Sequence, residues 1–380
     1  MRIDAIESFA VRIPLKPERR MVSALGRHEV SDYVLVKVTT GDGLVGVGEA
    51  TVTPRWSGET VWGAKALIDH VFAPVLIGLD PSDIPTVDAR MEAVAVSNWF
   101  AKAALEMACL DLAARARDVP LYEYIGGAQR SLRIRSRFSL GAYAPAVAAE
   151  RASERVAAGF DTIKVKVGTD VHEDIERVAA VREAIGPDVA LTIDANGGWD
   201  EQAARWCLER MAPFRLALVE QPLPRGDHSG LRRLRAQTGH VIMADESCFD
   251  MVHARELIEM ECCDVLSLYP GKNGGILRAR AIAEFASSRG VACSIGSNLE
   301  WDVGTAAMLH LIVATPNMRV ETFPGDCLGP SYHETSIVRE PLKIEGPFTT
   351  LGDGPGLGVD VDWDKVHSHL MPSSATPPCR

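Results

Sequence analysis

Three acidic residues stand at the ends of three short apolar segments in the middle of the chain. They are Asp194, Glu220 and Asp245, separated by 26 and 25 residues, which is the length of one strand and one helix. In a barrel of alternating strands and helices, the carboxyl ends of the strands meet at one mouth, so these carboxylates are predicted to face a shared site. Oxygen ligands of this kind suit a hard divalent cation. We therefore predict that they bind Mg²⁺, with Mn²⁺ as the alternative ion.

Two lysines lie on the segment before the first of these acids. Lys164 and Lys166 alternate with apolar residues, so they share one face of a predicted strand. Strands of a parallel barrel are buried on both faces, so a lysine pair there needs a function. A carboxylate-held metal beside lysines is suited to removing a proton next to a substrate carboxylate and stabilising the enediolate. Because neighbouring cations disfavour another positive charge, we predict that Lys164 and the metal lower the pKa of Lys166.

The elements that would position these residues follow a regular rhythm from about Leu132 onward. Strand-like segments alternate with helix-like segments at intervals of roughly 25 residues, which indicates an α/β fold with a parallel barrel. The eight candidate strands end near Ser139, Lys166, Asp194, Glu220, Asp245, Leu268, Ile295 and Glu321.

The remaining segments have different patterns. Residues 1–50 alternate in the manner of strands, and residues 59–118 are mainly helical. The last segment is rich in Gly and Pro and is too short for a core of its own. We predict an N-terminal α+β domain over residues 1–125 and a catalytic barrel over residues 126–325. Residues 326–380 are predicted to pack back on the first domain.

Composition argues against several classes of partner. The net charge is −11 and the Lys and Arg residues do not cluster, which argues against nucleic acid. No apolar run approaches the ~20 residues needed to cross a bilayer, and the first residues lack the pattern of a signal peptide. The eight cysteines include no Cys-x-x-Cys pair, which favours a reducing compartment. We predict a cytoplasmic protein that binds neither nucleic acid nor membranes.

Several short motifs occur together in one order along the chain. They are Gly48-Glu49-Ala50, Lys164-x-Lys166, Asp194-Ala-Asn-Gly-Gly-Trp199, Glu220-Gln-Pro222, Ala244-Asp-Glu-Ser247, Gly274-Gly275 and Pro355-Gly-Leu-Gly358. In these residues the chain resembles the enolase superfamily, and within it the muconate lactonizing enzyme subgroup of the mandelate racemase/muconate lactonizing enzyme family. The resemblance implies a modified (β/α)7β TIM-like barrel with an α+β capping domain. It also implies a small carboxylic acid as substrate and a homo-oligomer between a dimer and an octamer.

The same resemblance assigns roles to individual residues. The three acids match the family's Mg²⁺ ligands, Lys166 matches its acid/base on the second strand, and Lys164 matches the lysine that polarises the substrate carboxylate. Loops around Met21–His28 and Thr51–Thr60 would close over the mouth of the barrel. The residues expected to contact substrate are Ser139, Asn196, Ser297, Asn298, Glu321, Arg55 and Trp56.

The chain departs from the family at the end of the sixth strand. The family has Ser-Leu-Lys there, and its lysine faces the opposite side of the substrate, whereas this chain has Ser267-Leu268-Tyr269. The nearest lysine is Lys272, three residues later. Because a tyrosine ordinarily titrates near about 10, Tyr269 suits an acid or a hydrogen-bond donor better than a base. Tyr269 and Lys272 are both candidate catalytic residues, and loss of the facing lysine favours reactions that need one base.

These observations leave four functions open. A cycloisomerase similar to muconate lactonizing enzyme comes first, since it needs one base. A dehydratase also needs one base, whereas a racemase or epimerase of a small hydroxy or amino acid would need Lys272 to reach the substrate. A barrel that binds metal and carboxylate without turnover is the alternative of another class.

Overall fold

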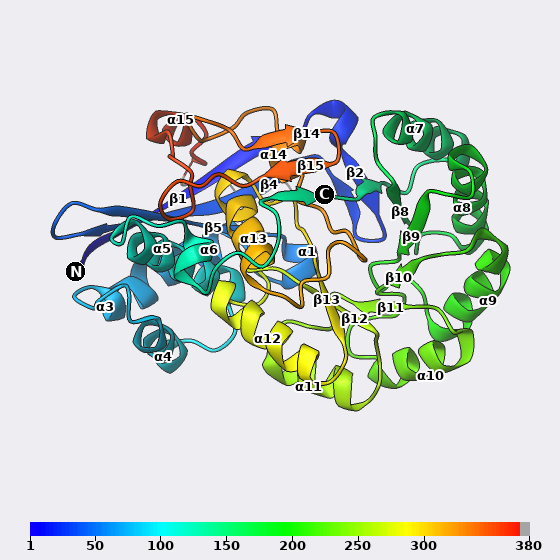
Figure 1. Ribbon diagram of the computed structural model, residues 1–380, viewed down its shortest axis with the longest axis horizontal. Helices are drawn as coiled ribbons and strands as arrows, with labels where there is room; N and C mark the ends of the chain where they lie inside the picture. The colour runs from blue at the N-terminus through cyan, green and yellow to red at the C-terminus, as the bar shows by residue number, and fades with distance from the viewer. Residues whose placement is uncertain (373–380) are drawn as a thin grey trace.

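The central feature of the computed structural model, which describes residues 1–372, is a curled sheet of seven parallel strands. Each strand pairs with the next one along the chain, and helices surround the sheet (Figure 1). The strands are β7 (Phe138–Leu140), β8 (Thr162–Lys166), β9 (Ala190–Asp194), β10 (Leu218–Glu220), β11 (Ile242–Ala244), β12 (Val265–Leu268) and β13 (Ala292–Ile295). The α/β, TIM-like fold class predicted from the sequence is confirmed.

A loop occupies the position of the eighth predicted strand. In the described residues, a single parallel bridge from Cys293 to Met318 continues the sheet beyond β13. The backbone amide of Arg137, just before β7, donates to the carbonyl of Gly325, so the loop spans the gap between β13 and β7. The prediction of a full strand ending at Glu321 is therefore wrong. The amide of Arg319 still donates to the carbonyl of Cys293 on β13, but residues 320–323 form turns that bond back to Arg319.

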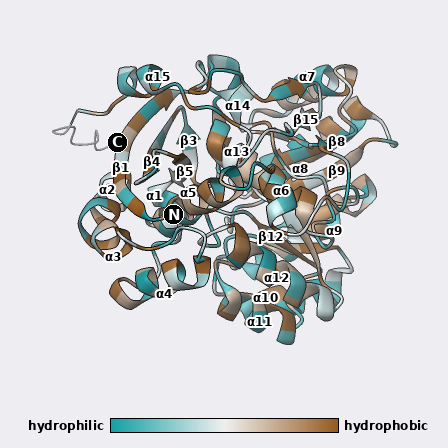
Figure 2. Cartoon of the chain, turned by 60° about the vertical axis from the view of Figure 1, so that its left-hand side comes forward, coloured by the Kyte–Doolittle hydropathy of each residue, from teal (hydrophilic) through white to brown (hydrophobic). Residues whose placement is uncertain are grey.

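Helices cover the outer face of the barrel sheet. Four of them begin at an aspartate whose carboxylate accepts hydrogen bonds from amides of the first turn, which have no partner within the helix: Asp170, Asp200, Asp227 and Asp250. Figure 2 shows apolar and polar residues side by side on the outer helices, as expected where one face packs on a sheet. The helices are α7 (Pro145–Ala157), α8 (Val171–Ile185), α9 (Glu201–Met211), α10 (His228–Thr238), α11 (Met251–Glu259), α12 (Ile276–Ser288) and α13 (Asp302–Ala314).

The N-terminal part is an antiparallel sheet, ordered β1-β4-β5, covered by helices. The helix α5 (Trp99–Arg115) lies very close to β5, because a Cβ on Gly48 would come within 1.8 Å of the carbonyl oxygen of Ala104. A hairpin of β2 and β3 and the short helix α1 (Pro54–Ser57) line the cavity described below. The strands are β1 (Ile3–Pro14), β2 (Met21–Ser23), β3 (Gly26–His28), β4 (Val30–Thr40) and β5 (Val45–Val52), and the other α-helices are α2 (Val61–Leu67), α3 (Ala73–Leu76), α4 (Ile84–Val94) and α6 (Leu121–Tyr124).

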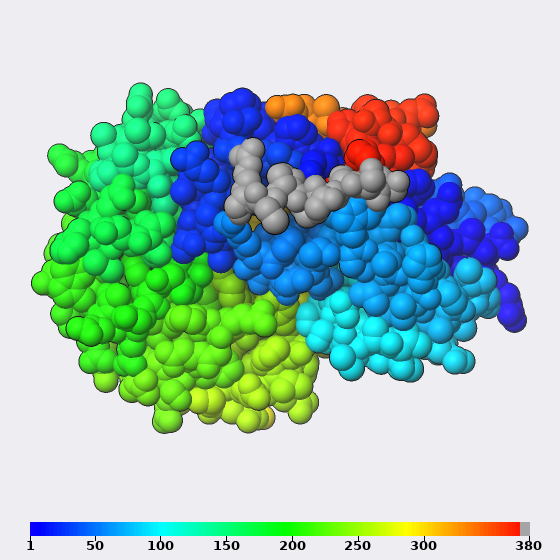
Figure 3. All heavy atoms as spheres, turned by 180° about the vertical axis from the view of Figure 1, so that it is seen from behind, coloured from blue at the N-terminus to red at the C-terminus, as the bar shows by residue number. Residues whose placement is uncertain are grey.

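The C-terminal segment contacts both of these parts. Its strands β14 (Lys343–Glu345) and β15 (Phe348–Thr350) form a small sheet with β6 (Arg133–Arg135), which precedes the barrel. Helix α15 (Trp363–Ser368) packs on β1, with the rings of Trp363 and Phe9 centred 5.3 Å apart. Figure 3 shows these red residues against the blue N-terminal ones. A further short helix, α14, covers Gly329–Tyr332.

Two buried glutamates join the N-terminal domain to the barrel helices. The carboxylate of Glu49 on β5 accepts from the amides of Trp301 and Gly304 at the start of α13, at 2.7 and 2.9 Å. Glu106 on α5 accepts from the amides of Ile276 and Leu277 at the start of α12, at 2.9 and 2.8 Å. Burial raises the pKa of Glu49 to about 8 and that of Glu106 to about 7. The N-terminal domain thus supplies acceptors for the amides that begin two barrel helices.

Two structural findings relate to the expectations drawn from the composition. The seven cysteines within residues 1–372 are buried thiols, and burial raises the pKa of Cys109 to about 12. Cys379 lies outside the described residues. Over the described range, no helix combines the length and the apolar character that crossing a bilayer requires.

Candidate active site

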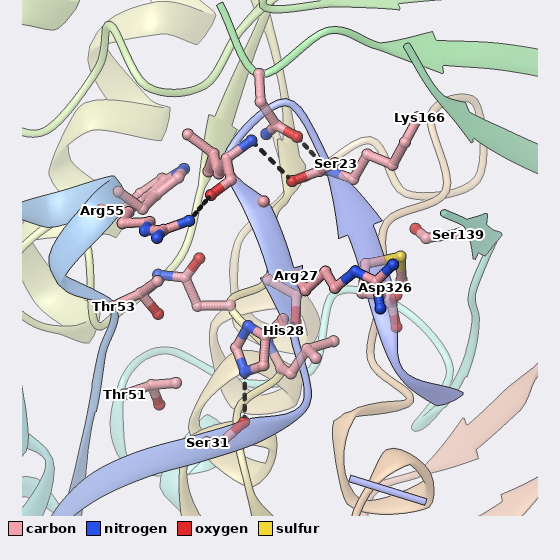
Figure 4. Close-up of a pocket in the computed structure, with 18 of the residues that line it drawn as sticks. Ser23, Arg27, His28, Ser31, Thr51, Thr53, Arg55, Ser139, Lys166 and Asp326 are labelled. Carbon is pink, nitrogen blue, oxygen red and sulfur yellow. Dashed lines mark hydrogen bonds between the residues drawn. The ribbon is translucent and has the colours of Figure 1, made fainter. Parts of the chain in front are cut away.

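A cavity of about 970 Å³ lies between the carboxyl ends of the barrel strands and the N-terminal domain. Figure 4 shows its lining, with Ser139, Lys166 and Asp326 on the barrel side and Arg27, His28 and Arg55 on the side of the N-terminal loops. The barrel residues that line it are Arg137, Ser139, Lys164, Lys166, Asp194, Asn196, Glu220, Asp245, Ser297, Asn298, Leu299 and Asp326. The cavity therefore contains all three predicted metal ligands and both lysines of β8.

The register of the sheet places the acids and lysines side by side. Lys166 is opposite Asp194 across β8 and β9, and Asp194 is opposite Glu220 across β9 and β10. Asp245 follows β11, and its amide donates to the side-chain oxygen of Gln221 at 2.9 Å, which ties the two strand ends together. Because strand ends in a parallel sheet are aligned, regular spacing in sequence becomes proximity in space.

Each of the three acids is paired with a cation from the protein itself. The ammonium of Lys164 bridges Asp194 and Glu220 at 3.0 and 3.2 Å, and that of Lys166 lies 2.5 Å from Asp194. Lys272 lies 2.7 Å from Asp245. Within residues 1–372, no three His, Cys, Asp or Glu side chains are gathered around a common ion position. Three buried carboxylates on neighbouring strands, two already sharing one cation, are nevertheless a donor set that suits a hard divalent ion.

The charges of the site shift its pKa values in opposite directions. Burial alone would raise the pKa of Asp194, but Lys164 and Lys166 outweigh it and lower that pKa. Burial likewise would lower the pKa of Lys166, but the carboxylates of Asp194 and Glu220 outweigh it and raise the pKa. The lowering of the Lys166 pKa by Lys164 together with a bound metal stays a prediction, because the carboxylates that raise this pKa are the ones that would hold the metal.

Tyr269 and Lys272 lie behind the cavity rather than in its lining. The ring of Tyr269 is fully buried beside the indole of Trp56, at 5.6 Å between centroids, and its hydroxyl has no hydrogen-bond partner in the described residues. The ammonium of Lys272 is also fully buried and donates to the carboxylate and carbonyl of Asp245 and to the carbonyl of Ser267, at 2.7, 2.9 and 2.6 Å. In this structure Lys272 holds Asp245 and does not face the cavity.

A hydrogen-bonded series leads from the N-terminal domain to Lys166. The indole Nε1 of Trp56 donates to Glu246 at 3.1 Å, and the amide of Asn196 donates to the same oxygen at 2.8 Å. The other end of that amide accepts from Lys166 at 2.8 Å. Burial raises the pKa of Glu246 to about 8.

Polar groups on the N-terminal loops form the other side of the cavity. Arg55 on α1 donates to the carbonyl of Leu25, which joins this helix to the hairpin of β2 and β3 (Figure 4). His28 is hydrogen-bonded to Ser31 at 2.8 Å, and burial lowers its pKa. The two predicted capping loops therefore meet above the strand ends.

Most residues expected to contact substrate line the cavity, and one does not. Ser139, Asn196, Ser297, Asn298, Arg55 and Trp56 all lie in the lining. Glu321 does not: its side chain is 62% exposed and pairs with Arg130 at 2.9 Å. The expectation for Glu321 is wrong, because the strand that would have aimed it at the mouth of the barrel is replaced by turns.

Three buried charged residues, Arg137, Asp326 and Glu246, are among those that the sequence interpretation missed. Arg137 is buried and donates to Glu220 at 2.9 Å, while Asp326 and Glu246 are buried beside the site. Alternation along the strand places Arg137 on the same face as Ser139, which was a signal available in the sequence. That signal was ambiguous, because Arg135 has the same phase and pairs with Asp161 at the surface.

Comparisons with known proteins agree with this geometry. Residues 6–126 match the family described as mandelate racemase/muconate lactonizing enzyme, N-terminal domain, and residues 147–365 match the one described as enolase C-terminal domain-like. A hydrophobic dipeptide epimerase of Enterococcus faecalis is 36% identical over 361 residues, covering 94% of this chain and 99% of that enzyme. A chloromuconate cycloisomerase of Cupriavidus necator is 35% identical over 373 residues, covering 97% and 99%.

A solved structure is similar over almost the whole chain. The dipeptide epimerase of Enterococcus faecalis, in complex with Mg and the dipeptide L-Leu-L-Tyr, superposes with a TM-score of 0.90 at 36% identity, covering 95% of this chain and 100% of that one. The matches extend over the capping domain and the barrel, and the relatives are isomerases. This chain therefore belongs to the mandelate racemase/muconate lactonizing enzyme family of the enolase superfamily.

Proposed function

We propose that this chain is a Mg²⁺-dependent enzyme that removes or delivers one proton next to the carboxylate of a small acid, with Lys166 as its one base. The reaction that fits best is a cycloisomerisation of the muconate-lactonizing type. The supporting observation is the contrast between Lys166, which faces the cavity, and Tyr269, which stands where the family has a second lysine. A relative that is a chloromuconate cycloisomerase supports the same reaction.

Some residues of the site would stabilise negative charge on the substrate, and others would transfer the proton. Asp194, Glu220 and Asp245 would hold Mg²⁺, which when bound supplies positive charge to the substrate carboxylate and the enediolate. Lys164, beside two of these carboxylates, would donate to the same substrate carboxylate. Lys166 moves the proton at the neighbouring carbon, and Asn196 orients its ammonium.

Epimerisation is the second candidate, because a dipeptide epimerase is among the relatives. It needs a second base on the opposite face of the substrate. Lys272 makes three hydrogen bonds behind the cavity and would have to give up all of them to reach substrate. Bonds to charged groups are each worth about 1.5–3 kcal/mol, so that rearrangement is costly. The geometry favours one base.

Proton exchange in heavy water tests the assignment. The enzyme with Mg²⁺ would be incubated with cis,cis-muconate and with both epimers of a set of dipeptides and hydroxy acids, and deuterium incorporation followed by NMR. One-base chemistry predicts that deuterium enters on a single face and that only one epimer exchanges. If both epimers exchange, and Lys272→Ala silences one of them, the enzyme uses two bases.

A further inference from the structure

The ammonium of Lys166 contacts two barrel residues, Asp194 and Asn196, and the second of them is linked to the capping domain. The ammonium donates to the side-chain oxygen of Asn196, whose amide nitrogen donates to Glu246. The same Glu246 oxygen accepts from the indole of Trp56, which belongs to α1 of the capping domain. A continuous series of hydrogen bonds of 2.8, 2.8 and 3.1 Å therefore joins a capping helix to the predicted base.

The backbone conformation and the hydrogen bonds of Asn196 fix the orientation of its side chain. Asn196 follows β9 with a φ of 44°, in the left-handed region that asparagine tolerates better than most residues. The backbone amide of Asn196 donates to the carboxylate of Asp194 at 2.9 Å. Both ends of its side chain are then committed, one to Lys166 and one to Glu246, so the side chain has a single orientation.

The position of the Trp56 indole is also fixed, by ring packing and by the attachment of α1 to the hairpin. The side chain of Trp56 is buried, and its ring packs on those of Phe249 and Tyr269, with centroids 5.2 and 5.6 Å away. The neighbouring Arg55 ties α1 to the β2–β3 hairpin through the carbonyl of Leu25. The indole can donate to Glu246 only while α1 is seated on the barrel.

We propose that Trp56 and Glu246 are positioning residues that set the ammonium of Lys166 only when the capping helix is seated. Glu246 presents one carboxylate oxygen to two donors, one from each domain, so loss of the indole leaves Asn196 and Lys166 with fewer restraints. This inference rests on the proposed role of Lys166, and it adds a route by which the capping domain reaches the proton-transfer step.

Chemical labelling of Lys166 tests this without any substrate. The protein would be treated with limiting acetic anhydride, and acetylation of Lys166 would be compared by mass spectrometry with that of the exposed Lys343. Trp56→Phe keeps an aromatic ring but removes the donor, and it should raise relative labelling of Lys166 about three- to tenfold, the factor expected for one hydrogen bond. Trp62→Phe on α2 is the matched control and should leave labelling unchanged, because Trp62 does not line the cavity.

A pair of substitutions at Glu246 separates the hydrogen bonds from general packing. Glu246→Gln keeps an oxygen acceptor and should label as the wild type does, whereas Glu246→Leu removes it and should label as Trp56→Phe does. If Trp56→Phe labels at the wild-type ratio, or if Trp62→Phe raises it equally, the proposed positioning is wrong. The Trp56 variant decides this even if the leucine variant fails to fold.

Turnover provides a readout that distinguishes positioning from substrate contact. With the acid identified by the exchange assay, Trp56→Phe should lower kcat about three- to tenfold with KM nearly unchanged. A rise in KM at constant kcat would mean that Trp56 contacts substrate, which contradicts the proposal. Full activity of Lys166→Ala would overturn the proposed function instead, and the labelling result would still report on the hydrogen bonds.

Discussion

Two lysines on one strand have different surroundings although they are only two residues apart. Lys164 lies between Asp194 and Glu220, so its charge is matched by two buried carboxylates. Lys166 meets one carboxylate and the neutral Asn196, and it lies nearer the open part of the cavity. Lys164, with two carboxylate partners, is suited to holding a substrate anion. Lys166, with one carboxylate partner, is better suited to proton transfer.

Replacing Lys166 tests this division directly. Lys166→Ala should lower turnover by about 10²–10⁴-fold, the usual contribution of a general acid or base. Binding of Mg²⁺, measured by calorimetry, should persist because the three carboxylates remain. Lys343→Ala, at an exposed lysine on β14, serves as the control and should keep wild-type turnover. Retention of more than about a tenth of the activity in the Lys166 variant would assign the base elsewhere.

Tyr269 offers a second prediction at this scale. Its buried hydroxyl has no partner within the described residues, and an unsatisfied buried polar group costs about 1–3 kcal/mol. Tyr269→Phe should therefore raise the free energy of unfolding by about 1 kcal/mol and leave kcat within about twofold of wild type. Urea denaturation and steady-state kinetics measure the two effects. A tenfold loss of kcat would show that the hydroxyl takes part in the reaction.

At the scale of elements, the residue at which a strand ends was easier to predict than the strand with which it pairs. The strands β8, β9 and β10 end at Lys166, Asp194 and Glu220 as expected, because an apolar run that stops at a charged residue marks the buried strand and its mouth. The segment before Glu321 pairs with β13 only around Met318, and the residues after Arg319 turn back on themselves. Local pattern does not reveal which backbone groups find a neighbouring strand.

The role of Lys272 could not be read from the sequence for a related reason. Its three acceptors belong to Asp245 and Ser267, on the loop after β11 and on β12, and only the folded sheet brings them together. Spacing indicated a lysine near the site, but its direction depends on which carbonyls lie within reach. Arg137, which reaches across the barrel to Glu220, was missed for the same reason.

The contact of α5 with β5 supports a prediction about packing. Gly48→Ala would place a methyl group within 1.8 Å of the carbonyl of Ala104, so the helix must move away from the sheet. We expect a loss of about 1–3 kcal/mol or more in the free energy of unfolding, measured by urea denaturation. Gly41→Ala, where no atom lies within 4 Å of the added carbon, is the matched control. Equal stability of the two variants would contradict this close contact.

At the scale of the whole molecule, the two domains are joined by buried acids whose charge depends on pH. Glu106 has an ordinary pKa of 4.5 and a folded pKa of about 7, because burial opposes its ionisation. A carboxyl group with a raised folded pKa favours the folded state at low pH. That contribution, on the order of 3 kcal/mol, is lost as the pH rises from about 4.5 to about 7.

Glu106→Gln should remove this pH dependence. The wild type should exceed the variant most in stability near pH 5, and the difference should shrink towards pH 8, as measured by urea unfolding at each pH. Glu284→Gln on α12 is the control, because that glutamate is exposed and paired with Arg280. A wild-type-to-variant difference that stays constant from pH 5 to pH 8 would show that Glu106 does not titrate in this range.

The seating of α12 and α13 on Glu106 and Glu49 also limits how this architecture can be divided. Both α12 and α13 begin with amides that donate to glutamates of the N-terminal domain. A barrel separated from residues 1–125 would therefore lose these bonds and a buried face of its core. The two parts are not exchangeable modules. A graft of this catalytic mouth onto another capping domain would succeed only if the new domain brought glutamates to the same two helix ends.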